Sequence, residues 1–349
     1  MNKVKKSIIT RNVVDYKINR QIKKTHQPIA GDVAIFKVVS IGKHSSIQGV
    51  NGNNTYIFEG DYIMGAFGNR YATGQFEGYV PEGYHSRYQI LGKGGAIGIL
   101  ESMNAKFNKV GATMLKLVGY ATDERGNILN TKLLHDELLH FNAYKERPYK
   151  VILSVGSSMD SGKTTSAGYL CRGLRAAKNK VAYIKLTGTV YTKDRSFVRD
   201  CGAHYVTDFS HLGFPSTYMC GMEELLDLHE TLLARTEHIK PDYVVIEIAD
   251  GLLQRETWAL INNYAFMNTI DHIFLSCGDS MSVMTGIEIL KNIGMKPFAV
   301  GGLFTASPLL AKEVREFCDL PVLGLEGLMT PEMLFAAIDK SRIKALVAA

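Results

Sequence analysis

The sequence predicts an α/β fold with a mostly parallel, doubly wound sheet, preceded by a small all-β barrel or sandwich. The second half alternates short apolar strands with segments of helical period, which is typical of a parallel sheet covered on both faces. The first half is rich in glycine, β-branched residues and turn signals. A length of 349 residues favours two domains over one. An apolar fraction of 46% and a charged fraction of 21% exclude a disordered chain.

Composition also predicts where the protein resides. The longest apolar runs, such as 151–155, are strand-sized and fall far short of the ~20 residues that cross a bilayer. The first thirty residues lack the apolar stretch and cleavage site of a secretory signal. The five cysteines show no paired framework. We therefore expect free thiols, a cytoplasmic location and no membrane partner.

Positive charge is concentrated at the N-terminus. The net charge is +6, and residues 1–30 alone carry six Lys and two Arg. This pattern predicts a basic N-terminal arm over residues 1–30 on a nearly neutral body. Nucleic-acid binding would need a basic face that continues into the β domain, and the sequence gives little sign of one. A nucleic-acid partner is therefore not expected.

Residues 31–132 are predicted to form the all-β domain. Turn signals such as 51–54 and 123–126 separate short strands, which is typical of a small barrel or sandwich. The segment 65–72 contains Arg70 and Tyr71 beside glycines, and it is either a recognition loop or a tight barrel corner. The strands expected are 33–40, 55–58, 62–67, 96–101 and 115–121.

The predicted α/β domain covers residues 149–349 and follows a linker helix at 133–148. The linker has apolar residues at helical spacing and ends at Pro148. In sheets of this kind ligands bind at the carboxyl ends of the strands. The strands expected are 151–155, 181–186, 204–208, 243–248, 273–276, 298–303 and 322–325, with helices between them.

A phosphate-binding loop follows the first of these strands. The loop ends in Gly-Lys-Thr at 162–164 and opens a helix, although the usual G-x-x-x-x-G-K-[ST] pattern places its first glycine where Ser157 stands. The variant loop still meets the physical requirements for binding phosphates, because successive backbone amides and a helix N-terminus would surround them. Lys163 would neutralise the β- and γ-phosphates, and Thr164 would bind Mg²⁺. The nucleotide-binding residues predicted here are Gly156, Ser157, Asp160, Ser161, Gly162, Lys163, Thr164 and Thr165.

The loop Gly-Ser-Ser-Met-Asp-Ser-Gly-Lys-Thr at 156–164 resembles that of dethiobiotin synthetase and the related cobyrinic acid amidotransferases, which are P-loop NTPases. It is also similar to the loop of MobB, the GTP-binding adaptor of molybdopterin-guanine dinucleotide synthesis. Residues 181–189 look like the second strand of dethiobiotin synthetase, and 193–203 resembles a helix of MobB. The resemblance covers about 151–329. It implies Mg²⁺ with ATP, or GTP, and a homodimer, since both families pair.

The resemblance also implies a metal and base shell. Glu247, which ends a strand, would be a Mg²⁺ ligand together with Thr164 and Asp194. The turn after Glu247 departs from the family pattern, so Asp250 is a further candidate. Each carboxylate could instead only cap a helix. Where the families often carry an Asn that reads the base, this sequence has Thr305, which leaves the identity of the base open.

Lys185 stands near the end of an otherwise apolar strand. Its ammonium would emerge at the ligand-bearing edge and neutralise a carboxylate, carbamate or phosphate of an acceptor. In dethiobiotin synthetase a lysine at this place contacts substrate, so Lys185 is, with Lys163, the predicted catalytic residue. Thr187 and Thr189 could hydrogen-bond the same acceptor. The alternative is a lysine that only extends into solvent from a strand end.

One other constellation has metal-ligating residue types, in a C-x2-H-x6-H-x8-C run. Its spacing fits no standard zinc finger, so these positions are interpreted as core and loop. The run consists of Cys201, His204, His211 and Cys220.

Together these observations predict a Mg-ATP-dependent ligase or kinase-like phosphotransferase that activates a small carboxylate or carbamate, similar to dethiobiotin synthetase. The alternative is a MobB-like GTP- or ATP-binding adaptor or switch in cofactor biosynthesis. A switch needs only the nucleotide site, whereas a ligase also needs an acceptor pocket facing the γ-phosphate.

Overall fold

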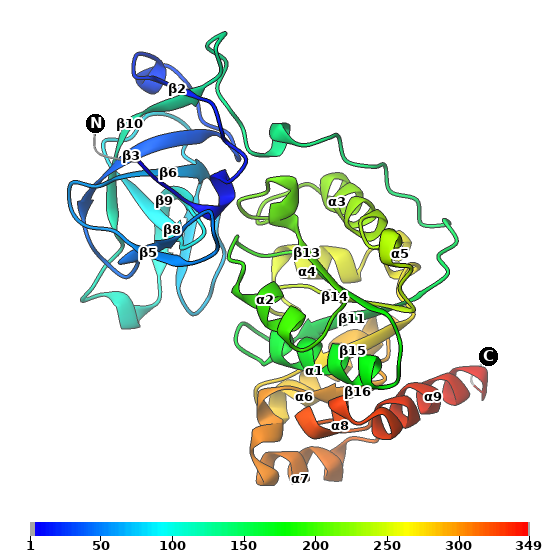
Figure 1. Ribbon diagram of the computed structural model, residues 1–349. Helices are drawn as coiled ribbons and strands as arrows, with labels where there is room; N and C mark the ends of the chain where they lie inside the picture. Colours follow the sequence, from blue (N-terminus) through cyan, green and yellow to red (C-terminus); the bar gives the residue numbers. More distant parts are fainter. Residues whose placement is uncertain (1–3, 348–349) are drawn as a thin grey trace. The chain divides into compact units, whose positions relative to one another are not determined.

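The computed structural model describes residues 4–347, which form two compact units (Figure 1). The β unit comprises residues 4–137 together with two later segments, 188–192 and 209–219. The α/β unit comprises 138–187, 193–208 and 220–347. The two later segments of the β unit interrupt the α/β part of the chain, so the units are not simply consecutive in sequence. No helix in the described part of the chain is long and apolar enough to span a membrane.

The β unit contains a barrel. Its main sheet runs in the order β1-β6-β3-β10-β8-β9-β7, with β2 also paired to β10. A further pairing of β6 with β9 closes five strands into a ring. The strands are β1 (Lys5–Lys6), β2 (Lys17–Asn19), β3 (Val33–Ser40), β6 (Tyr62–Phe67), β7 (Phe76–Tyr79), β8 (Tyr88–Gly92), β9 (Ala96–Met103) and β10 (Met114–Thr122), beside the hairpin of β4 (Ser46–Gln48) and β5 (Asn54–Tyr56).

Aromatic side chains fill this barrel. Phe36, Phe67, Tyr88 and Tyr120 belong to one buried cluster. The ring of Phe67 lies 5.6 Å from Phe36 and 5.7 Å from Tyr88 between centroids, both edge to face. Edge-to-face rings add to the free energy gained by burying their apolar area. These side chains alternate with outward-facing residues along their strands, as a closed sheet requires.

The N-terminal segment is part of the barrel sheet, which differs from the basic arm expected over residues 1–30. Lys5 and Lys6 pair in parallel with β6, and β2 pairs antiparallel with β10. Between them Ile8 and Ile9 are 3% exposed. The apolar residues anchor the segment, while Lys5 forms an ion pair with Asp61 and Lys6 donates to the carbonyl of Val13. Residues 1–3 of the expected arm lie outside the described residues.

The α/β unit contains a six-stranded sheet in the order β13-β12-β14-β11-β15-β16, with every pairing parallel. Its strands are β11 (Lys150–Gly156), β12 (Val181–Lys185), β13 (Tyr205–Asp208), β14 (Tyr243–Glu247), β15 (His272–Ser276) and β16 (Ala299–Gly301). The expected strand at 322–325 is reduced to a single bridge between Val322 and Val300.

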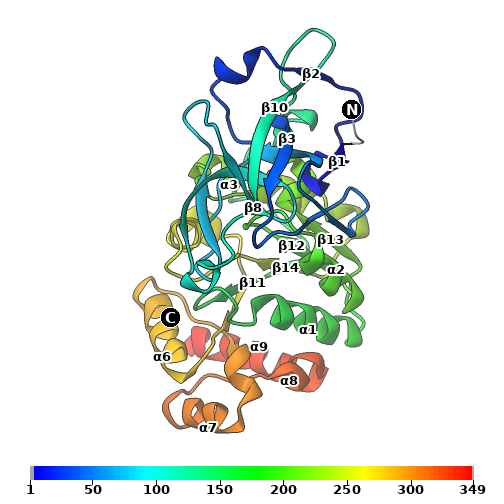
Figure 2. The same cartoon turned by 90° about the vertical axis from the view of Figure 1, so that its left-hand side faces the viewer.

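Helices cover both faces of this sheet. In Figure 1 α3 and α5 lie on one side, and α1, α8 and α9 lie on the other; α1 also packs directly on α8 and α9 (Figure 2). A buried apolar cluster joins α1 to the central strands. The helices are α1 (Lys163–Ala176), α2 (Lys193–Asp200), α3 (Met222–Ala234), α4 (Arg255–Ile261), α5 (Tyr264–Met267), α6 (Ser280–Asn292), α7 (Pro308–Phe317), α8 (Leu325–Met329) and α9 (Pro331–Val347).

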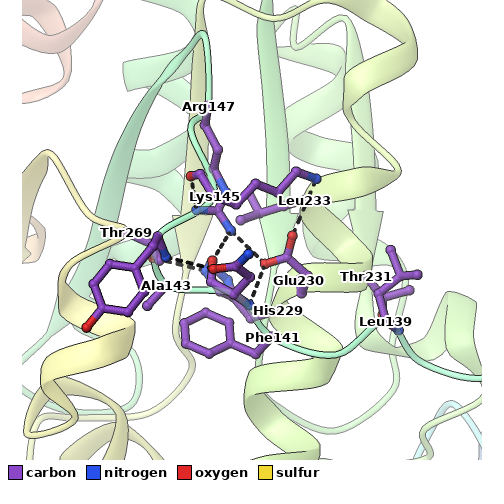
Figure 3. A network of polar contacts seen from close by, with 12 residues as sticks. Leu139, Phe141, Ala143, Lys145, Arg147, His229, Glu230, Thr231, Leu233 and Thr269 are labelled. Carbon is purple, nitrogen blue, oxygen red and sulfur yellow. Dashed lines mark hydrogen bonds and ion pairs between the residues drawn. The ribbon is translucent and has the colours of Figure 1, made fainter.

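The linker helix expected at 133–148 is not formed. Only a 3-10 turn at Lys132–Leu134 is helical, and the rest of the segment is irregular. From residue 138 the chain runs along α3 as an extended strap. The amide of Leu139 donates to Thr231 Oγ1 (Figure 3), and the amide of Phe141 donates to Asp227 Oδ1.

Charged side chains fix the end of this strap. Arg147 donates to Glu230 Oε2 at 2.6 Å, and Lys145 lies 3.5 Å from Glu230 Oε1 (Figure 3). Glu230 is only 3% exposed, so its charge depends on these partners. The helical spacing of the apolar residues in 133–148 therefore did not lead to a helix. Contacts to α3 stabilise the irregular segment, whereas a short helix without such contacts is only marginally stable.

Candidate functional site

The predicted phosphate loop connects β11 to α1, which begins at Lys163. Asp160 and Gly162 have φ values of 62° and 93°, so the chain turns through left-handed conformations just before the helix. A Cβ on Gly156 would lie 2.4 Å from Ser161 Oγ and 2.7 Å from Lys163 Cγ. The close approach explains why the glycine stands at 156 rather than 157: it is needed where the strand meets the returning loop.

The start of α1 is open to an anion. The residue before the helix is Gly162, which has no side chain to cap it, and the first turn contains no acidic residue. The first amides of any helix lack partners within that helix, and the helix dipole favours negative charge at this end. The loop therefore presents the backbone donors that a phosphate group requires.

Lys163 curls back over the loop. Its Nζ donates to the carbonyl of Ser158 at 2.7 Å, and the residue is 6% exposed. Burial lowers the pKa of Lys163, and the charges of Glu247 and Asp250 act in the opposite direction. The ammonium thus lies inside the loop, at the place where phosphate charge would be neutralised.

Thr164 and Glu247, predicted as metal ligands, are in direct contact. Thr164 Oγ1 donates to Glu247 Oε1 at 2.9 Å. Glu247 ends β14, which lies beside β11, and it is 1% exposed. Tyr183 donates its hydroxyl to the other oxygen, Glu247 Oε2, at 2.8 Å. Both carboxylate oxygens are therefore oriented, and burial followed by the charge of Glu247 raises the pKa of Tyr183.

Lys185 joins this group from β12. Its Nζ forms an ion pair with Asp194 and lies 3.3 Å from Glu247 Oε1. Burial alone would lower the pKa of Lys185, but the carboxylates of Asp194 and Glu247 outweigh it and raise the pKa. Lys185 therefore does not extend into solvent as a strand-end lysine would. Contacts therefore link Thr164, Lys185, Asp194 and Glu247 into one group, and the metal-binding and catalytic roles expected of them stay predictions.

Thr187, Thr189 and the residues of the zinc-like run have other partners or places in the fold. Thr187 Oγ1 accepts a hydrogen bond from the amide of Ala249 at 2.8 Å, so it fixes the turn after Glu247. Thr189 belongs to the β unit, in the segment 188–192. Of the zinc-like run, His204 Nδ1 accepts from the amide of Val181. Within residues 4–347, no cluster of three or more His, Cys, Asp or Glu side chains could hold a metal ion.

The turn after Glu247 lies against the phosphate loop. Asp250 has a φ of 62°, and a Cβ on Gly251 would lie 2.4 Å from the carbonyl oxygen of Ser157. This contact is backbone against backbone, so it leaves little freedom for a larger residue. Gly251 was not predicted from the sequence, although a glycine four residues beyond an acidic strand end was a signal for it.

A cavity of about 320 Å³ opens beside the start of α1. Thr165 and Thr305, both predicted to contact nucleotide, line it together with Leu303 and Leu325. The hydroxyl of Thr305 donates to the carbonyl of Gly302 at 2.8 Å. Gly302 has a φ of 101°, and a Cβ there would lie 2.5 Å from the carbonyl of Ser161. The size and mixed lining of this cavity suit a nucleoside.

No family model and no curated protein sequence matches the chain. Similar solved structures include the signal recognition particle receptor FtsY from Elizabethkingia anophelis, at 16% identity and a TM-score of 0.36 over 56% of this chain and 66% of that one. Chloroplast FtsY from Physcomitrella patens is also 16% identical, with a TM-score of 0.38 over 57% of this chain and 67% of that one.

The overlap thus spans about two thirds of the length of each receptor. A likeness this limited transfers nothing about their activity to this chain. Neither of these two structures is a dethiobiotin synthetase or a MobB protein, so the finer resemblance read from residues 151–329 stays a prediction. The structure shows a parallel sheet with a strand–loop–helix connection at its centre, at the place where the sequence predicts the phosphate loop.

Proposed function

We propose that the α/β unit binds a nucleoside triphosphate with Mg²⁺ and transfers the γ-phosphoryl group to a small carboxylate or carbamate. The observation that carries this proposal is the contact of Thr164 Oγ1 with Glu247 Oε1 at 2.9 Å. It sets the hydroxyl at the start of α1 beside a buried strand-end carboxylate. Hydroxyl and carboxylate oxygens beside a phosphate loop are the ligands that Mg²⁺ takes in nucleotide sites.

The residues present fit such a cation. Thr164, Glu247 and Asp194 would hold it, with phosphate oxygens completing the ligand set. Bound Mg²⁺ would neutralise charge on the β- and γ-phosphates. Lys185 already pairs with both carboxylates, so its ammonium and a divalent cation share the same acids. Lys163 would exchange its bond to Ser158 for a phosphate oxygen.

Transfer then depends on positioning and charge neutralisation. An oxygen of the acceptor carboxylate forms a bond to the γ-phosphorus, while the bond from that phosphorus to the bridging oxygen of the β-phosphate breaks. The products are an acyl phosphate and the nucleoside diphosphate. Lys163 neutralises charge developing on the phosphates, and Lys185 neutralises the acceptor. ATP and GTP both remain candidates, and a homodimer is proposed from the family resemblance alone.

The ion pairs of Lys185 favour a second candidate. A lysine held by two acids of the site is engaged before any acceptor arrives. In a nucleotide-dependent switch, cation binding at Glu247 and Asp194 would weaken these pairs and release Lys185. The protein would then act as a MobB-like adaptor, whose output is a change at Lys185 rather than a phosphorylated product.

Calorimetry on the full chain tests the shared part of both candidates. We expect one site per chain for ATP or GTP in the presence of Mg²⁺, and loss of that site in Lys163→Ala and Thr164→Val. Lys291→Ala, at an exposed position on α6, is the matched control and should bind normally. Unchanged binding in both loop variants would rule out this site.

Release of the nucleoside diphosphate separates the two candidates. Turnover measured with and without a panel of small carboxylates should rise with the acceptor, and Lys185→Ala should abolish the rise while Lys185→Arg keeps part of it. Nucleotide binding without any acceptor effect would exclude the transferase and leave the switch.

A further inference from the structure

The β unit contains a second cavity, of about 290 Å³, that the proposed function does not use. Four separate segments of this unit line it. The residues that matter for its chemistry are Lys43, His44, Arg70, Gln75, Lys93 and Thr189. Arg70 lies in the glycine-containing segment 65–72 that was either a recognition loop or a barrel corner.

The charge of this cavity has one sign. Among the described residues that line it, Lys43, Arg70 and Lys93 are cationic and none is acidic. The ion pairs within residues 4–347 include neither Lys43 nor Lys93. Several like charges in a partly enclosed space are unfavourable unless an anion joins them.

Arg70 is held in a fixed orientation. It is 9% exposed, and it donates to the carbonyl of Leu91 and, at 2.8 Å, to Gln75 Oε1. Lys43 donates to the same Gln75 oxygen and lies 4.8 Å from the ring centroid of Phe76. One amide oxygen thus draws two cationic side chains together, which is an arrangement suited to a bidentate anion.

Burial and the neighbouring cations alter the acid–base behaviour of His44 and Lys43. Burial, followed by the charge of Arg70, lowers the pKa of Lys43 to about 7 and holds the pKa of His44 well below its usual value. His44 is 2% exposed, and its Nδ1 has no hydrogen-bond partner among the described residues. Buried polar atoms are usually hydrogen-bonded, so a ligand in this cavity would give His44 Nδ1 a partner.

The later segment 188–192 completes the cavity and is fixed to the barrel. Thr192 and Gln48 exchange two hydrogen bonds, at 2.7 and 3.0 Å. A Cβ on Gly94 would lie 2.0 Å from the carbonyl oxygen of Val190, so the two backbones are in tight contact. Thr189 is therefore presented to the cavity by a well-anchored loop.

We propose that this cationic cavity binds a small organic anion, carrying a carboxylate or phosphate group on a hydrogen-bonding body, independently of the nucleotide site. Lys43, Arg70 and Lys93 would contact the anionic group. His44, Gln75 and Thr189 would contact hydroxyl or amide groups of the ligand. The volume suits a metabolite of a few carbon atoms rather than a polymer.

Calorimetry on the full-length protein with inorganic phosphate and, separately, succinate tests this inference. The titrations use the Lys163→Ala variant as background, so that the phosphate loop does not contribute. We expect one saturable site for at least one of the two probes, and the probe that binds identifies the anionic group. Lys43→Gln and Lys93→Gln should each weaken binding about tenfold or more, because each removes a charge-assisted hydrogen bond.

The matched control is Lys116→Gln, which removes the same charge from an exposed position on β10. It should bind as the background does. The proposal is overturned if neither probe saturates, or if all three glutamine variants behave alike. Nucleotide binding by the parent protein would be unaffected by either result, so failure here is distinguishable from failure of the proposed function.

Discussion

The phosphate loop of the α/β unit and the cationic cavity of the β unit gather positive charge in different ways. The loop is one run of nine residues, 156–164, and relies on backbone amides and one buried lysine. The cavity takes side chains from four segments that are up to 148 residues apart, from Lys43 to Tyr191. In the first region the nearby Lys185 is balanced by Asp194 and Glu247, whereas in the second the described lining residues supply no acid.

This difference has a physical consequence. A site in which cations and carboxylates are paired keeps its charges at neutral pH, so Lys185 has a raised pKa. A site with cations alone loses protons more readily, so Lys43 has a pKa of about 7. Removal of a lysine should therefore lower the free energy of unfolding in the first region, where it breaks ion pairs, and not in the second, where it relieves repulsion between cations.

The largest effect is expected from Lys185→Met. It leaves Glu247 buried with one fewer cation, and breaking a buried ion pair typically costs about 3–5 kcal/mol. The free energy of unfolding, measured with urea on the full chain, should fall toward that range and recover in part with Mg²⁺ and nucleotide. Lys150→Met is the control, since the Lys150 side chain is 49% exposed and its pair with Asp271 should contribute less than ~1 kcal/mol. Equal losses in the two variants would contradict the paired-charge interpretation.

The second largest effect is expected from Gly251→Ala, which should displace the phosphate loop. In Gly251→Ala the new methyl group would lie 2.4 Å from the Ser157 carbonyl oxygen and push the loop backbone away. Nucleotide affinity should drop by roughly 10- to 100-fold, which corresponds to about 1.4–2.8 kcal/mol. Gly278→Ala, where a Cβ would meet no atom within 4 Å, provides the matched control. Normal affinity in Gly251→Ala would show that this turn does not support the loop.

The pH dependence of anion binding tests whether the cationic cavity, whose described lining residues include no acid, holds the anion through Lys43. Lys43 faces Arg70, Lys93 and Lys106, and His44 stays neutral, so Lys43 is the group that loses its charge as pH rises through about 7. Affinity for sulfate, whose own charge is constant there, should decrease about five- to tenfold from pH 6 to pH 9. Lys43→Gln should flatten this profile while Lys93→Gln preserves its slope. A flat profile in the parent protein would be evidence against the assignment.

The smallest effect is expected at the nucleoside cavity. Thr305→Asn adds an amide beside Leu303 and Leu325 without changing the loop. The ratio of ATP to GTP affinity should change by a few-fold, since one added hydrogen bond contributes about 1 kcal/mol. Competition calorimetry measures the ratio, and Thr330→Asn at the end of α8 serves as the control. An unchanged ratio would place the base away from Thr305.

The strands of both units were largely predictable because apolar alternation and turn residues are local signals. Residues 33–40 and 62–67 form strands with the expected bounds. The short strands β7 and β8 were missed, because glycine-rich segments of four or five residues carry little periodicity. The linker at 133–148 and the N-terminal arm were predicted wrongly, since contacts to α3 and to β6 override their local patterns.

Local patterns in the sequence were enough to predict the parallel sheet, the strand–loop–helix connection after residue 150 and the strand ends at which Lys185 and Glu247 stand. These features depend on neighbouring residues and on the rule that parallel strands end at one edge. The pairing of Lys185 with two acids, and the cavity that Arg70 lines with Lys43 and Lys93, became evident from the folded chain alone. Such groupings depend on how the barrel closes and on segments far apart in the chain, and no local pattern of residues encodes that geometry.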